Sequence, residues 1–253
     1  MQITDLVLKL GRNDVKLIRR DSFMLLLLGF ILWISIVLRY VLPWLNEYLA
    51  ETGVLSGDTI NASLSHYYPL IIGYLAVFEG ALIVGFLFGF ILLDEKDDNT
   101  LLAMLVTPLP LRQYLIYRVV LPCILATIVI MAMMLFINVA LPSFWQLLLI
   151  AAGASFAAPI ASLFFGIFAE NKVQGFAYSK FSGLAGMLII GSWFVDEPLQ
   201  WLFGIFPPFL INKAYWMAVD GNQLWWMAWL AGIVLQIALI AWMMRIFTRK
   251  IYR

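Results

Sequence analysis

The residues with the most distinctive chemistry form an acidic collar between two long apolar segments. Four acids lie within five positions, interrupted only by Lys96: Asp94, Glu95, Asp97 and Asp98. An almost wholly apolar run follows at 101–106, and Pro108 closes it. Acids favour the positive end of a helix dipole, and proline cannot continue a helix interior. The pattern therefore predicts a very short apolar helix that is preceded by a cluster of carboxylates.

This short helix needs something to cover it. Residues 101–106 give fewer than two helical turns, which are marginal alone in water, and too few residues to cross a bilayer. Leucines and Met104 cover most of its circumference. One interpretation is a helix that fits an apolar groove, in its own chain or in a partner. The other is an ordinary cytosolic loop whose apolar residues touch the membrane.

Two further ionisable residues lie inside apolar segments, Arg39 and Glu79. Such groups are costly within a bilayer and usually face a partner or water. At about 1.5 Å per residue from the cytosolic ends, Arg39 lies about 25 Å and Glu79 about 21 Å up. The similar heights favour an ion pair that clamps the first two spans. The alternative is that Glu79 lines a substrate route or titrates.

Composition places these groups in a membrane protein. The chain is 64% hydrophobic and 12% charged, whereas soluble domains are about half apolar and a quarter charged. A span needs about 20 largely apolar residues, and the 253 residues suit one all-α membrane domain. Six spans are predicted at Ser22–Leu45, Tyr67–Leu93, Tyr117–Leu141, Gln146–Phe168, Gly175–Val195 and Leu224–Phe247. The fifth is the weakest, because its uncharged part after Lys180 is short.

The basic residues predict the orientation of the spans. Of the 16 Lys and Arg, 14 lie in the termini and the loops on one side, whereas the opposite loops hold only Lys213. Positive loops are cytoplasmic, so both termini and the collar loop, 94–116, are expected in the cytosol of a multi-pass plasma (inner) membrane protein. In a helix over residues 1–21, the basic residues would lie on one face and the apolar residues on the other. This pattern predicts an amphipathic helix lying on the inner leaflet.

The segment 196–223 is external in this topology. It is apolar and aromatic, with Trp201 in its first arm, but Pro207 and Pro208 bisect it. Each arm is too short to span, so we predict two short helices in the outer leaflet, or a re-entrant hairpin.

Small residues in the second span form another pattern. Gly80, Gly85 and Gly89 allow a neighbouring helix to approach closely. The neighbour is either a second copy of the chain, at a dimer seam, or another helix of the same chain.

The collar loop resembles a known motif. Glu95-Lys96-x-x-Asn99-Thr100-Leu101, then Leu105-Val106-Thr107-Pro108, resembles the loop between the second and third spans of type-2 ABC exporter permeases. The basic N-terminal helix, six spans and short external helices also look like that family. One departure is Leu102, where the family pattern carries Glu.

The resemblance implies an ATP-driven exporter. In that family this loop is a coupling helix, which implies contact with a separate ATPase through Glu95, Asp97, Asp98, Thr100, Leu101, Leu102, Leu105, Thr107 and Pro108. It further implies two ATPase copies that bind ATP and Mg, and a second permease copy. Substrate would pass between the protomers along the first, second and fifth spans. We expect no nucleic-acid partner.

No enzymatic or metal site is predicted for the chain itself. Its glycines never form G-x-x-x-x-G-K-[ST], and no catalytic or metal-ligand cluster gathers at one depth. The aromatic external segment favours a small hydrophobic or amphiphilic substrate, drug or lipid-like. The alternatives are an ion-coupled secondary transporter that uses Glu79, and a membrane scaffold that transports nothing.

Overall fold

The computed structural model describes residues 3–52, 63–98 and 111–251, with side chains at 10–52, 63–98 and 113–250. Every regular element within these residues is helical, as predicted. The α-helices are α1 Ile3–Arg20, α2 Ser22–Ile36, α3 Leu42–Glu51, α4 Tyr68–Ile72, α5 Glu79–Asp97, α7 Leu111–Ile137, α8 Phe144–Ser155, α9 Ala157–Phe168, α10 Lys172–Trp193, α11 Pro207–Val219 and α12 Trp225–Ile251. Two π-helical segments, η1 Val37–Val41 and η3 Gly73–Phe78, and two 3-10 segments, η2 Leu64–Tyr67 and η4 Leu199–Ile205, complete them.

Five helical segments in the described chain are long and apolar enough to cross a membrane. They are Ser22–Glu51, Leu64–Asp97, Gln113–Ile137, Phe144–Phe168 and Trp225–Lys250. They correspond to five of the six predicted spans, but the first two are longer than predicted. The first continues through η1 into α3, and the second begins at η2 and extends through the collar to Asp97.

The remaining predicted span corresponds to α10. This helix has 22 residues and is about 33 Å long, enough to cross a bilayer. Lys180, its serines and its glycines lower its hydropathy, and it is not among the five apolar segments. A sixth span at α10 therefore stays a prediction.

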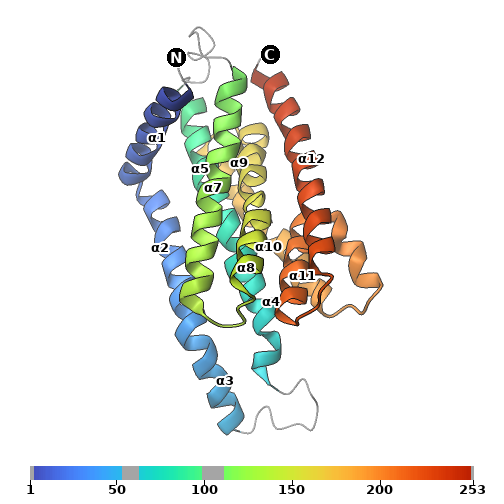
Figure 1. Cartoon of the computed structure of the whole chain (residues 1–253). Helices are drawn as coiled ribbons and strands as arrows, with labels where there is room; N and C mark the ends of the chain where they lie inside the picture. Colours follow the sequence, from blue (N-terminus) through green and yellow to red (C-terminus); the bar gives the residue numbers. More distant parts are fainter. Residues whose placement is uncertain (1–2, 53–62, 99–110, 252–253) are drawn as a thin grey trace.

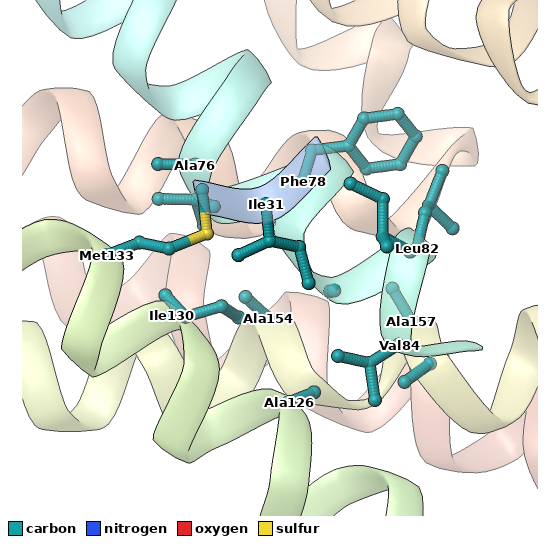
Figure 2. Packing of buried hydrophobic residues seen from close by; sticks show 14 of the residues in the cluster. Ile31, Ala76, Phe78, Leu82, Val84, Ala126, Ile130, Met133, Ala154 and Ala157 are labelled. Atoms are coloured by element: carbon teal, nitrogen blue, oxygen red, sulfur yellow. The ribbon is translucent and has the colours of Figure 1, made fainter. Parts of the chain in front are cut away.

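α5 forms the centre of the bundle, with 14 of its 19 residues buried. A Cβ atom at Gly85 would lie 2.6 Å from the Ala158 carbonyl oxygen of α9, and one at Gly89 would lie 2.7 Å from the Phe165 ring. These glycines therefore serve packing within the chain rather than a dimer seam. On another side of the core, Ile130 and Met133 of α7 pack toward the small side chains of η3 and α8 (Figure 2).

The segment 196–223, which was predicted to be external, folds into η4 and α11, two arms too short to span, as the double proline predicted. Pro207 and Pro208 occupy the first turn of α11, where proline is tolerated. Trp201 in η4 is 39% exposed, whereas most of α11 is buried against α12 and α8. Lys213 of α11 is buried and pairs with Glu197 at 2.5 Å, which ties the two arms together.

Both chain ends lie at one end of the bundle (Figure 1). α1, the last turn of α5 and the end of α12 lie at this end, while α3 and η2 lie at the opposite end. The termini thus share a side, as the distribution of basic residues predicted. That this side is cytoplasmic stays a prediction.

Candidate functional site: the buried charges that join α1, α5 and α7

The acidic collar is the last turn of α5, and its members do not act together. Asp94 pairs with Lys172 of α10 at 2.7 Å. Glu95 is only 5% exposed and turns into the bundle, while Lys96 donates to the Ala169 carbonyl at 2.7 Å. Asp97 and Asp98 are exposed. The side chains diverge because successive residues of a helix point about 100° apart.

A buried ionic cluster joins the three helices α1, α5 and α7. Arg118 of α7 binds Asp14 of α1 at 3.0 Å and also Glu95 of α5. The Tyr117 hydroxyl donates to Asp14 at 2.8 Å, and the Tyr114 hydroxyl donates to Glu95. All five residues are at most 5% exposed. The cluster therefore fastens the N-terminal helix to both helices that flank the loop.

The spacing of residues on α7 explains how one helix supplies three members of this cluster. Tyr114, Tyr117 and Arg118 stand at i, i+3 and i+4, so they share a face. The Arg118 guanidinium uses its forked donors, since Nε reaches the Tyr114 hydroxyl at 3.1 Å while the two Nη groups reach the carboxylates. A planar guanidinium suits such a site better than a lysine ammonium. One oxygen of Asp14, Oδ1, has no hydrogen-bond partner among the described residues.

A second, more exposed cluster connects α2, α5 and α10. Lys172 lies 2.7 Å from both Asp21 and Asp94. Asp21 is also the N-cap of α2, and its Oδ1 accepts from the backbone amides of Phe23 at 2.8 Å and Met24 at 3.3 Å. Partial burial raises the pKa of Asp21, but the Lys172 ammonium and the two amides outweigh it and hold that pKa below its usual value.

Two lysines donate hydrogen bonds to backbone carbonyls at the C-terminal end of α9. Lys96 donates to the carbonyls of Gly166 and Ala169, and Lys250 of α12 donates to that of Ile167 at 2.6 Å. The last carbonyls of a helix have no partner within it and carry its negative dipole end, so cations stabilise them. Lys96 therefore fixes α5 to the end of α9.

The predicted loop contacts have different outcomes. Glu95 was predicted to contact an ATPase, and this is wrong for the structure described, because Glu95 is buried against Arg118. Asp97 and Asp98 are exposed at the same end and stay predicted contacts. The other predicted contacts lie outside the described residues: Thr100, Leu101, Leu102, Leu105, Thr107 and Pro108.

The predicted ion pair between Arg39 and Glu79 is not formed. Arg39, within η1, donates to the Phe136 carbonyl in the last turn of α7 and lies 5.0 Å from the centre of the Phe136 ring. None of the ion pairs among the described residues includes Glu79. Arg39 is drawn to the negative end of the α7 dipole rather than to a carboxylate at similar height.

Sequence reasoning missed Asp14, Asp21, Tyr114 and Tyr117. The available signal was the i, i+3, i+4 pattern of two tyrosines and an arginine at the start of an apolar span. Among described residues, no group of three or more His, Cys, Asp or Glu is arranged to hold a metal ion.

Comparison with known proteins identifies the family of this chain. Residues 14–244 match the family model described as fluoroquinolones export permease protein Rv2686c-like. The chain belongs to this family. It is 30% identical over 246 residues to the fluoroquinolones export permease protein Rv2686c of Mycobacterium tuberculosis (strain ATCC 25618 / H37Rv). The match covers 95% of this chain and 93% of that protein, and MT2760 of strain CDC 1551 / Oshkosh matches equally. No solved structure matches.

Membership of this family agrees with the predicted type-2 ABC permease and with a transmembrane transport subunit rather than an enzyme. The match begins at Asp14 and includes Glu95 and Arg118, so the whole buried cluster lies within the family region.

Proposed function

We propose that this chain is the membrane-spanning subunit of an ATP-driven exporter that moves a small hydrophobic or amphiphilic drug out of the cytoplasm or inner leaflet. The observation that carries the proposal is the match to fluoroquinolone export permeases over nearly the whole chain. The relatives' name supports a drug-like substrate. The permease sits in the plasma membrane with both termini in the cytoplasm, as a pair of permease chains served by two ATPase copies that bind ATP and Mg.

Coupling to the ATPase runs through the loop at 95–108, with its contact surface beginning at Asp97. The buried cluster supports this arrangement, because Glu95 lies just before the contact surface and Arg118 follows the loop. A force on the loop therefore acts on two helices that already share a salt bridge. Asp14 extends the same connection to α1. A rigid anchor at both ends of the loop transmits movement of a bound ATPase to α5 and α7 together.

The decisive experiment is the variant Leu105→Asp, co-expressed with the candidate ATPase. If Leu105 fills an apolar cleft, the buried charge costs several kcal/mol, which corresponds to a loss of at least tenfold in complex formation. The measurements are ATPase co-purification and ATP-dependent drug export in proteoliposomes. The thermal stability of the permease alone should stay unchanged.

Val173→Asp is a matched control. Val173 is 77% exposed and follows Lys172, so it lies at the same end of the bundle. This variant adds the same charge outside the loop and should retain ATPase within twofold. If Leu105→Asp retains the ATPase and exports drug as well as the control does, coupling through this loop is refuted.

A second candidate function is ion-coupled transport through Glu79. It is favoured by the position of this carboxylate, which lies inside the second span without a cationic partner among the described residues. Drug accumulation in proteoliposomes that contain the permease alone, driven by a proton gradient, would support it. Loss of that accumulation in Glu79→Gln, with stability retained, would assign it to this residue.

A further inference from the structure

We propose that a cavity inside a single protomer, between α5, α9 and α10, binds the flat aromatic ring system of a drug-sized amphiphile. The proposal rests on the proposed export function and adds a binding site within one chain. The cavity measures about 320 Å³. Sites for drug-sized molecules begin at about 300 Å³, so one fused ring system fits.

Each of the three helices contributes one stripe to the cavity wall. On the α5 side the stripe is Phe78, Leu82 and Phe86, at steps of four residues. Such a stripe extends for about 12 Å along the helix axis. Residues at helical spacing on α9 and α10 face it. The cavity is thus elongated along the bundle and enclosed by the most central helix of the fold.

Aromatic rings in the wall present both faces and edges. Phe86 stacks on Phe165 with centroids 5.3 Å apart and planes only 2° apart. Phe164 of α9 meets Tyr178 of α10 edge-on, with ring centroids 5.7 Å apart and planes 80° apart. Aromatic pairs favour offset-stacked and edge-to-face arrangements, and each adds to the gain from apolar burial. An inserted flat ring therefore finds partners for its face and for its edge.

Small side chains create the space that the rings surround. Ala157 and Ala161 of α9 and Ala185 of α10 line the cavity where larger residues would fill it. The hydroxyl-bearing members of the lining are Tyr178 and Ser182, and none of the lining residues in the described chain is charged. A ligand must therefore leave charged groups outside and insert an uncharged ring. This requirement favours an amphiphile over a wholly polar compound.

The surroundings of the cavity connect it to the bilayer and to the external segment. Phe181 lines the cavity and is 57% exposed, so the cavity reaches the protein surface along α10. Phe206 and Pro208, where α11 begins, line it as well. Phe206 packs edge-on against Phe78 at 5.7 Å. A ring can thus enter sideways from the membrane and come to lie against the start of α11.

The test uses the permease alone, in lipid nanodiscs and without ATPase, titrated with the fluorescent fluoroquinolone ciprofloxacin. The cavity-filling variant Ala185→Phe should weaken binding at least tenfold. Phe181→Ala removes a ring from an exposed position, so it should fold normally and weaken binding about threefold or more. The control Leu184→Phe adds the same ring at a neighbouring residue of α10 that is 65% exposed, and should bind within twofold of the unmodified protein.

Equal affinities in Phe181→Ala, Ala185→Phe and the unmodified protein would overturn the proposal. It would also fail if Ala185→Phe released a co-purifying phospholipid, detected by native mass spectrometry, and left ciprofloxacin affinity unchanged, because the cavity would then hold an acyl chain. Failure of the proposed function looks different. In that case the unmodified protein binds ciprofloxacin as described, but its complex with the ATPase exports none when ATP is supplied.

Discussion

Replacing Arg118 by methionine should destabilise the permease strongly. The substitution removes the one cation between Asp14 and Glu95, each at most 5% exposed. Methionine matches the length of the arginine stem, so the change is mainly one of charge and hydrogen bonding. Two buried carboxylates are then left with the hydroxyls of Tyr114 and Tyr117 as their side-chain donors among the described residues.

The size of the effect follows from the burial. Removing one partner of a buried ion pair costs about 3–5 kcal/mol, chiefly because the remaining charge is left unpaired. Arg118 serves two carboxylates, so the upper part of this range is expected. For a chain of this size, each kcal/mol shifts the melting temperature by about 2–4 °C. We therefore expect a decrease of roughly 10 °C or more.

The assay is thermal unfolding of the purified permease in detergent, followed by tryptophan fluorescence. Arg12→Met is the matched control, because Arg12 lies on α1 close to Asp14 but is exposed. Its melting temperature should stay within a degree or two. Combining Arg118→Met with Asp14→Asn and Glu95→Gln should recover more than half of the loss, because no unpaired charge remains.

Two results would contradict this reasoning. If Arg118→Met melts like Arg12→Met, the cluster is hydrated and does not fasten the three helices. If the triple variant is no more stable than Arg118→Met, the arginine acts through its packing rather than through its charge.

Two further predictions concern packing and pH. Gly85→Ala should lower the free energy of unfolding by about 2 kcal/mol or more, because its Cβ would lie 2.6 Å from the backbone of Ala158. Gly183 has open space around it, so Gly183→Ala should raise the free energy of unfolding by about 0.5–1 kcal/mol through helix propensity. Equal melting temperatures of the two variants would refute this. Because Lys172 and two amides lower the pKa of Asp21, its contribution is present above about pH 4 and is lost as the pH falls through the lowered pKa. Asp21→Asn should therefore reduce the acid-side loss of thermal stability, and an unchanged pH profile would argue against the cluster.

The collar shows how far the sequence could be interpreted. Composition was sufficient to locate five apolar spans and the short arms around Pro207, because these depend on runs of residue types. It did not show that α5 continues four residues beyond Leu93. That extension places Asp94, Glu95 and Lys96 on different faces of one helix, and only tertiary contacts decide which face turns inward.

Arg39 and Glu79 show a different limit. Their heights along the spans were estimated from residue counts, but height does not determine the direction in which a side chain points. Arg39 lies within η1, and Glu79 directly follows η3. π-helical turns shift the phase of every residue that follows, and no sequence pattern marked them. Similar heights along the spans were therefore not sufficient to predict an ion pair between them.

These corrections divide the loop motif into an anchoring part and an exposed part. Glu95 and Lys96, the first two residues of the family-like pattern, bind Arg118 and the end of α9. In the proposed coupling, the contact surface for a partner ATPase begins at Asp97. Leu102 stands where the family pattern carries Glu, so the proposed contact sequence is more apolar than the family's. We therefore expect binding there to depend on burial of leucine more than on charge. For this reason Leu105→Asp, rather than neutralisation of Asp97 and Asp98, is the sharper test of coupling: charges at the rim of an interface mainly set association rates and salt sensitivity.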